Sequence, residues 1–477
     1  MARFHSIVSA SVLLGLFVAV GCGTTEDGST FGGDGTSGGA SGDPGSSSFG
    51  GTTSSGASGT TKPCEGLACK QVDCGGGATT SLSGKVYDPS GTIPLYNAII
   101  YVPNATLAPF TEGIACDQCG TVPSGNPITT AITNSKGEFV LKNVPVGVEI
   151  PLVVQIGRWR RQVKVPGVAQ CTDTPLDAAI TRLPRNKAEG EIPKIAITTG
   201  GADSLECFLR KLGIDDAEFT NPDSDGRIHL YSGVGGSKKG ATPNSETLWD
   251  DDAGLKKYDM VILSCEGNEY EAGQGGVSPK SATAKANVKD YLDKGGRVFA
   301  SHFHYTWFKK GATDLQSTAS WMNNADAPDQ DVTVDTSFAK GVAFSEWLTE
   351  VGATPTPGQM PMTELRRNVT TVPGAGAPVD VSRRWLYATP PSGEETKFYS
   401  FNTPVGTAAD KQCGRGVYTD IHVSSGDDSG GTFPGNCKTT GLTSQEKALL
   451  FLLMDLASCI QDDNKPPTAP PSGPAIK

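Results

Sequence analysis

The sequence predicts a multidomain protein in which an all-β sandwich is followed by an α/β domain with a mostly parallel sheet. Residues 75–182 contain short alternating segments separated by Gly/Pro turns, which is typical of a sandwich. Residues 191–461 instead alternate continuous apolar runs with amphipathic helical segments, which indicates buried parallel strands covered by helices. A chain of 477 residues is long enough for two such domains.

The N-terminus indicates export and a lipid anchor. Residues 1–21 form a signal peptide whose apolar core, residues 6–20, is too short to span a bilayer as a stable helix. Ala19-Val20-Gly21-Cys22 resembles the bacterial lipobox, which implies cleavage before Cys22 and a diacylglycerol on its sulfur. An ordinary secretory signal with an accidental cysteine is the alternative. Gly23 differs from the aspartate that resembles an inner-membrane retention signal, so we expect a cell-envelope lipoprotein in the outer membrane of a Gram-negative bacterium.

Two segments contain too few apolar residues to form a hydrophobic core. Residues 22–74 are a linker rich in Gly, Ser and Thr, and residues 462–477 are a proline-rich tail. Apolar burial cannot offset the entropy of ordering such segments, so the sequence predicts disorder in both. We expect the linker to hold the folded domains away from the membrane.

The cysteine count fits an oxidising compartment. Of the 12 cysteines, 11 remain when Cys22 is set aside, which predicts several disulfides and one odd thiol. Cys116-x-x-Cys119 lies in a Gly/Pro-rich insertion without the second CxxC of a zinc knuckle, so structural disulfides explain it better than redox or zinc chemistry. The spacing leaves the pairing open.

The charge of the chain limits its partners. A net charge of −11 argues against nucleic acid, because phosphate recognition needs a basic face. The one basic run, Arg158-Trp159-Arg160-Arg161, is expected to be a solvated strand or hairpin tip rather than a phosphate clamp.

The first domain is assigned to residues 75–182. Its strand segments are LSGKVYDPSG, LYNAIIYVPN, AITNSKGEFVLKNVPVG and IPLVVQIGRWRRQVKV, with turns at residues 88–91 and 134–137. The spacing of glycines and apolar residues from Gly84 to Gly147 resembles the carboxypeptidase regulatory-like domain. That resemblance implies a transthyretin-like or immunoglobulin-like sandwich that acts as a spacer or binding module without catalysis.

The second domain, residues 191–461, starts with an apolar strand at residues 193–199 and a helix that ends at Gly213. Asp203 and Glu206 suit a capping box for this helix. A second strand follows at residues 258–267, and then a helix at residues 282–296. Its inward residues are expected to be Ala284, Val288, Tyr291 and Leu292.

The remaining elements complete the same alternation. Residues 297–308 (RVFASHFHYTWF) are an apolar strand that ends in two of the chain's 5 histidines, and residues 415–423 are a fourth strand. Thr443 and Glu446 suit a capping box for a last helix that is apolar all round and therefore buried.

Polar and titratable residues gather where these four strands end. In an open parallel sheet, ligands bind beyond the carboxyl ends of the strands, so we expect these residues to share one mouth. The residues at the four ends are Gly200, Gly201, Glu266, His302, His304, Asp420 and His422.

The order of these motifs is similar to the class I glutamine amidotransferase-like fold, a flavodoxin-like architecture, and within it to the ThuA-like branch. The resemblance covers residues 191–461 apart from a divergent insert at about 313–396. It implies that His302 occupies the position of the nucleophilic cysteine and His422 that of the activating histidine. The missing thiol argues against glutamine hydrolysis, and Cys265 is interpreted as a disulfide partner.

Three hypotheses for the site remain open. In the first, His302 and His304 project to the same side of a strand and bind zinc or another divalent metal, with His422, Asp420 or Glu266 completing the ligands. In the second, His302 acts as an acid–base group with Glu266 or Asp420.

The third hypothesis, which the sequence favours, is a pocket that binds a small polar or carbohydrate ligand, or a scaffold role without a ligand. Its expected lining is Gly200, Gly201, His304, Tyr305, Trp307 and Asp420, with Trp321 or Trp385 in addition. The enzymatic alternative is a histidine-based or metal-assisted hydrolase that acts on a carbohydrate-type substrate through His302, His422 and Glu266.

Overall fold

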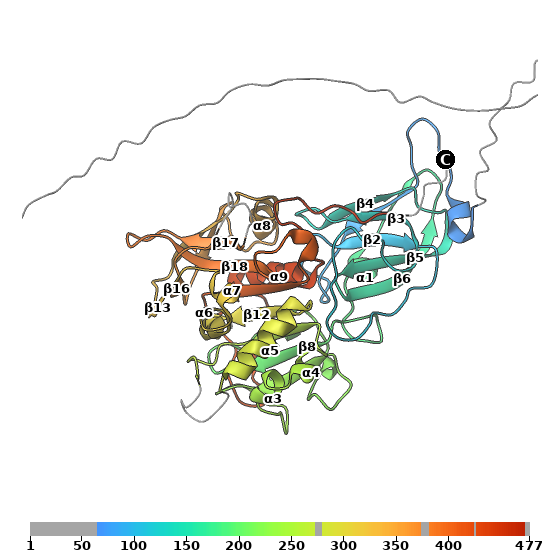
Figure 1. The fold of residues 1–477 in the computed structure, drawn as a ribbon. Coiled ribbons are helices and arrows are strands. Elements are labelled where there is room, and N and C mark those ends of the chain that lie inside the picture. Colours follow the sequence, from blue (N-terminus) through green and yellow to red (C-terminus); the bar gives the residue numbers. More distant parts are fainter. Residues whose placement is uncertain (1–63, 272–278, 374–380, 424–425, 473–477) are drawn as a thin grey trace, which may run out of the picture. The chain divides into compact units, whose positions relative to one another are not determined.

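Most of the regular structure is β, and the described part of the chain forms four sheets (Figure 1). The computed structural model describes residues 64–271, 279–373, 381–423 and 426–472. The predictions for the signal peptide, for lipidated Cys22 and for most of the linker lie outside the described residues. Within these ranges no helix is both long and apolar enough to cross a membrane.

The last residues of the predicted linker are ordered. They form the 3₁₀ helix η1 (Gly66–Lys70), and the backbone N–H of Leu67 donates to Asn104 Oδ1 at 2.8 Å. A disulfide joins Cys74 to Cys171. The prediction of disorder up to residue 74 is therefore wrong for these residues, because a covalent bond compensates for the apolar burial that they lack.

Two small sheets contain the strands of the first predicted domain. In β4 burial alternates strictly, and its inward residues Phe139 and Leu141 share an apolar cluster with Ile100 and Val154 of the other sheet. This is the alternation that the sequence predicted. The strands, in sheet order, are β4 (Glu138–Lys142), β1 (Ser81–Lys85) and β7 (Asp173–Pro175) in one sheet, and β3 (Pro127–Ile132), β2 (Ile99–Pro103), β5 (Gly147–Ile156) and β6 (Trp159–Val168) in the other.

A large mixed sheet of ten strands follows. Its four predicted strands, β8, β11, β12 and β19, are parallel neighbours, as expected. The sheet as a whole is mixed, since five of its nine strand pairings are parallel and four are antiparallel. In sheet order the strands are β15 (Gln359–Met362), β14 (Gln330–Val334), β17 (Arg383–Ala388), β18 (Glu395–Thr403), β19 (Gly414–Thr419), β12 (Arg297–Ser301), β11 (Met260–Leu263), β8 (Ile195–Thr199), β10 (Ile228–Ser232) and β9 (Phe219–Thr220).

The antiparallel strands come from the insert predicted at residues 313–396. β14, β15, β17 and the start of β18 extend the large sheet on the side of β19. Two further strands of the insert, β13 (Trp321–Asp326) and β16 (Arg366–Val369), pair with each other in a separate two-stranded sheet. The insert is thus part of the fold, and it places β13 and β16 near the carboxyl ends of the parallel strands.

Helices cover both faces of the large sheet. Ile195 and Ile197 of β8 pack in a cluster with α2, α8 and α9, whereas Ala196 packs in a second cluster with α3, α5 and α6. The helices are α1 (Ala178–Thr181), α2 (Leu205–Lys211), α3 (Glu246–Trp249), α4 (Asp252–Leu255), α5 (Ala282–Asp293), α6 (Thr306–Lys309), α7 (Thr313–Gln316), α8 (Ala339–Glu350) and α9 (Ser444–Ala457), and the short 3₁₀ helices are η2 (Asp216–Glu218), η3 (His302–Tyr305) and η4 (Ala409–Lys411).

The capping predictions have different outcomes. The capping box of Thr443 and Glu446 is present at α9. At α2 it is absent, because the N-cap is Ser204 and the carboxylate of Asp203 is used elsewhere. In α5 the buried residues are the four that the sequence predicted: Ala284, Val288, Tyr291 and Leu292.

Most of the basic run at residues 158–161 is buried rather than solvated, and only Arg161 of the run is partly exposed. It lies at the turn between β5 and β6, where Arg158 and Arg160 are 9% and 3% exposed. Arg158 Nη1 pairs with Asp259 Oδ1 at 2.5 Å, and Arg160 pairs with Glu191. Because Asp259 directly precedes β11, the tip of this hairpin joins the small sheets to the large one.

Disulfides confirm the prediction from the cysteine count. Five are present, and Cys265 is the one free cysteine among the described residues. The CxxC motif contributes to two different bonds, both of which cross from the insertion between β2 and β3 to the large sheet and its last helix. The pairs are Cys64–Cys69, Cys74–Cys171, Cys116–Cys413, Cys119–Cys459 and Cys207–Cys437.

The start of the predicted C-terminal tail is also ordered. Asp463 is 8% exposed and pairs with Lys340 and Arg415. Further along, the carbonyl of Pro470 accepts a hydrogen bond from Thr130 Oγ1 on β3 at 2.6 Å. The proline-rich composition predicted disorder here, but ion pairs to buried cations do not depend on apolar content.

Candidate metal centre

Three side chains from three strand ends converge at the carboxyl edge of the large sheet. They are Cys265 after β11, His302 after β12 and His422 after β19. Cys265 Sγ lies 3.5 Å from His302 Nδ1, which in turn lies 3.1 Å from His422 Nε2. The three donor atoms all lie within 4.8 Å of one another. Side chains from three of the four predicted strand ends therefore meet at this edge of the sheet.

The prediction for Cys265 is wrong. It was interpreted as a disulfide partner, but it is free and fully buried. Its sulfur faces the histidines because β11 runs parallel to β12 and both strands end at the same level. The backbone N–H of Gly267 points at the sulfur, with the nitrogen 3.5 Å away, and that of Phe303 also donates to it.

His302 occupies a sharp turn. β12 ends at Ser301, and the next residues enter the 3₁₀ helix η3, with His302 at φ +36°. A positive φ is uncommon for a residue with a Cβ and is often found at functional sites. The turn points the imidazole at Cys265 and His422.

The same turn separates His302 from His304. The expectation that both project to one side of a strand is wrong, because the strand ends before either residue. His304 Nε2 donates to the carbonyl of Ser264 at 2.8 Å, and its Nδ1 accepts from Trp307 Nε1 at 3.0 Å. Both ring nitrogens are therefore bonded within the protein, and His304 is not in the converging group.

The second nitrogen of each converging imidazole faces a side-chain oxygen. His302 Nε2 lies 3.0 Å from Oδ1 of Asn324 on β13. His422 Nδ1 lies 3.5 Å from Glu364 Oε2 and 3.4 Å from Arg366 Nη2. Two backbone hydrogen bonds bring Glu364 and Arg366 close to His422. The N–H of His422 donates to the carbonyl of Glu364, and the N–H of Arg366 donates to the carbonyl of Asp420.

Burial governs the protonation of the three groups. It lowers the pKa of His302 to about 3 and that of His422 to about 4, the latter aided by the charge of Arg366. Both imidazoles are thus neutral at pH 7 and present lone pairs. Burial also raises the pKa of the Cys265 thiol, and the nearby charge of Asp203 acts in the same direction. A positive ion beside the sulfur would oppose both effects.

Glu266 and the glycines of the first strand end have structural partners. Glu266 forms a fully buried ion pair with Lys280 at 2.6 Å and lies 4.0 Å from His304 Nε2. A Cβ on Gly200 would lie 2.1 Å from the carbonyl oxygen of Cys265, so the close approach requires glycine. Gly201 donates its N–H to the carbonyl of Val234. Gly200 therefore positions the backbone of Cys265.

The residues expected to line a ligand pocket are buried. Tyr305 and Trp307 are 2% and 1% exposed, and Asp420 is 0% exposed with hydrogen bonds from Asn368 and Tyr418. Trp385 packs in the other apolar cluster, beside α8 and α9. Among the aromatic residues named from sequence, only Trp321 is partly exposed near the histidines.

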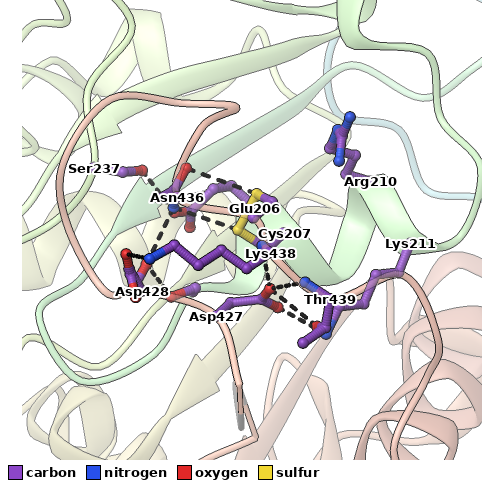
Figure 2. Close-up of a disulfide and its surroundings, with 12 residues drawn as sticks. Glu206, Cys207, Arg210, Lys211, Ser237, Asp427, Asp428, Asn436, Lys438 and Thr439 are labelled. Carbon is purple, nitrogen blue, oxygen red and sulfur yellow. Dashed lines mark hydrogen bonds and ion pairs between the residues drawn. A yellow bond between two sulfur atoms is a disulfide. The ribbon is translucent and has the colours of Figure 1, made fainter.

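A segment after His422, residues 426–439, is fastened to α2, and we call it the strap (Figure 2). The disulfide Cys207–Cys437 joins the two, and Lys211 Nζ pairs with Asp427 Oδ2 at 2.7 Å. Asn436 Nδ2 donates to Glu206 Oε1 at 2.9 Å. These contacts fix the chain that continues from the third converging residue.

Sequence reasoning identified His302 and His422 and missed Cys265, Asn324 and Glu364. The signal for Cys265 was present: the odd thiol implied by the count lies at a strand end next to two histidine-bearing ends. Nothing in the sequence signalled Asn324 or Glu364, because their strands lie in the divergent insert.

Comparison with known proteins gives no family for the chain. No protein-family model matches it, and no curated protein matches it. Among solved structures, two mutants of a type II cohesin–X-dockerin complex from Acetivibrio cellulolyticus align at 16% and 15% identity. Each alignment covers 31% of this chain and 79% or 78% of the other, with a TM-score of 0.15 in both, which is too low to indicate a shared fold.

Proposed function

We propose that this protein is a lipid-anchored component of the bacterial cell envelope whose second domain holds a divalent transition metal, in the first place zinc, between Cys265, His302 and His422. The observation that supports the proposal is the convergence of one sulfur and two imidazole nitrogens within 4.8 Å. The envelope location rests on the lipobox-like Ala19-Val20-Gly21-Cys22 and the odd cysteine count.

The hydrogen-bond pattern favours a metal over a proton relay. In a relay, the middle imidazole uses one nitrogen for each neighbour. Here the same atom, His302 Nδ1, faces both Cys265 Sγ and His422 Nε2, while its Nε2 is already at Asn324 Oδ1. A lone pair on His302 Nδ1 can accept a proton from only one of these neighbours at a time, whereas a cation between the three groups would be bound by the sulfur and both imidazoles together.

The distances also suit zinc. Bonds of about 2.3 Å to sulfur and 2.0–2.1 Å to nitrogen in a tetrahedral site separate the donor atoms by about 3.3–3.6 Å. The separations of 3.5 and 3.1 Å are close to that range. Asn324 and Glu364 would orient the ligating imidazoles from behind, which is the usual role of outer-shell oxygen acceptors.

Three protein ligands leave one position for water or substrate, which is the arrangement of catalytic zinc sites. A metal with an open position polarises a bound carbonyl or water. We therefore place metal-assisted hydrolysis ahead of the histidine-only alternative, and a carbohydrate-type substrate remains a proposal from the histidines and aromatic residues of the sequence. Binding through Tyr305 and Trp307 is less well supported, since both are buried.

The fold families are proposals as well. The parallel order β19-β12-β11-β8 and the strained turn at His302 support a class I glutamine amidotransferase-like domain. The two small sheets with a shared apolar cluster support a carboxypeptidase regulatory-like sandwich of transthyretin or immunoglobulin type.

Metal analysis of the full chain, purified in detergent, tests the proposal. We expect one equivalent of zinc after dialysis, and its loss in Cys265→Ser and His302→Ala. Ser264→Ala is the matched control, because Ser264 adjoins Cys265 and its buried hydroxyl has no hydrogen-bond partner among the described residues. A folded wild-type protein that takes up no zinc, cobalt or copper from a titration would refute the metal centre.

A further inference from the structure

Asp203 lies between the end of β8 and the start of α2, and its side chain is fully buried. Oδ1 accepts the backbone N–H of Val423 at 3.1 Å, and Oδ2 accepts the hydroxyl of Ser301. The sequence suggested that this residue caps α2, but neither contact is with the helix. One buried carboxylate thus holds two segments that lie far apart in the sequence.

Both of its partners adjoin the proposed metal ligands. Ser301 precedes His302, and Val423 follows His422. The register between β12 and β19 ends at the pair Ser301 and Thr419. The pairing does not continue to His302 and His422, so it does not by itself fix the distance between the histidines, and the carboxylate connects the residues that adjoin them.

We infer that Asp203 is a positioning residue for the centre, which sets the separation of His302 and His422. This inference rests on the proposed metal centre for its functional meaning. The structural tie itself can be tested without metal.

The test compares Asp203→Ala, Asp203→Asn and Ser264→Ala in the full chain. Asn keeps an oxygen for the Val423 N–H and an amide that can donate to Ser301 Oγ, but it removes the charge. Zinc affinity is measured by competition with a chromophoric chelator. The imidazole signals of the metal-free protein are measured by NMR with labelled histidine, which is tractable because the chain has 5 histidines.

For Asp203→Ala we expect zinc affinity to fall by about 10–100-fold, as for other outer-shell residues, and the signals of His302 and His422 to move. Asp203→Asn can keep both ties, so it should leave the signals near their wild-type positions and restore most of the zinc affinity that Asp203→Ala loses. Ser264→Ala should change neither. Wild-type affinity and unmoved signals in Asp203→Ala would overturn the inference.

The two proposals fail separately. If wild-type protein binds no metal, the proposed function is wrong, and the imidazole signals still decide whether Asp203 positions the histidines. If wild type binds zinc and Asp203→Ala binds it equally well, only the role of Asp203 is wrong.

Discussion

At the residue scale, the environment of His302 is the strongest sign of a functional site. A backbone conformation at φ +36° costs about 1–3 kcal/mol for a residue with a side chain, and surrounding contacts must hold it in place. Those contacts include Asn324 Oδ1 at Nε2 and the converging atoms at Nδ1. This backbone conformation directs the imidazole of His302 away from the strand direction and toward Cys265.

The exposed carboxylate of Glu364 gives the first prediction. Replacement by Ala removes the acceptor behind His422, so we expect zinc affinity to fall about tenfold or more, as when other metal centres lose an outer-shell acceptor. Glu364→Gln keeps an oxygen acceptor and should give an intermediate loss. The measurement is a chelator competition titration at constant pH.

The matched control for this prediction is Glu149→Ala, which removes another exposed carboxylate, on β5 of the small sheets. It should leave zinc affinity unchanged. Equal affinities for Glu364→Ala and Glu149→Ala would show that Glu364 does not orient His422.

At the element scale, periodicity and turn residues predicted the parallel half of the large sheet and the inner face of α5. They failed in the insert. All nine residues of β18 are buried, although two of them, Glu395 and Lys397, are charged and pair with each other. The sequence of β18 therefore lacks the continuous apolar run that predicts a buried strand. The site shares this limit: the strand ends were predictable from local sequence, whereas Asn324 depends on the pairing of β13 with β16.

The α2–strap connection gives the second prediction. The double substitution Cys207→Ser/Cys437→Ser opens a loop that spans 230 residues in sequence, so we expect the free energy of unfolding to fall by about 2–4 kcal/mol. Denaturant unfolding with the other disulfides intact measures the change. The control, Cys64→Ser/Cys69→Ser, opens a loop of only 5 residues and should cost less. A larger loss in the control would contradict the loop-entropy argument.

At the scale of the whole molecule, one apolar cluster runs from the two small sheets to a face of the large sheet. Trp347 of α8 donates its Nε1–H to the carbonyl of Pro94, and the ring of Tyr96 stacks on Phe451 of α9 at 5.4 Å. The apolar runs of the sequence predicted the core of the small sheets and the core of the large sheet separately. Their contact was not predictable, because it depends on the Arg158 ion pair and on disulfides whose pairing the spacing left open.

The dependence of stability on pH gives the third prediction. Glu189 lies in the segment between the small sheets and β8, and its hydrogen bond with Arg182 lowers its pKa from 4.5 to about 2. A lowered folded-state pKa stabilises the protein above pH 4.5, and this contribution disappears as the pH falls from about 4.5 to 2. Glu189→Gln should therefore be less stable than wild type at pH 6, with the difference nearly gone at pH 2.

Denaturant unfolding at several pH values measures this difference. Glu112→Gln, which removes a carboxylate that is 75% exposed, controls for the change in net charge. A gap between wild type and Glu189→Gln that stays constant from pH 6 to pH 2 would contradict the assigned ion pair.

The two disulfides that leave the CxxC motif have a consequence for the response of the chain to proteolysis. The disulfide Cys116–Cys413 joins cysteines 297 residues apart in the sequence, and Cys119–Cys459 joins cysteines 340 residues apart. A single backbone cut anywhere between residues 120 and 412 leaves the two fragments joined by at least two disulfides. Such a nicked molecule would migrate as one species until its disulfides are reduced, and a cut in an exposed loop would not by itself separate the two fragments.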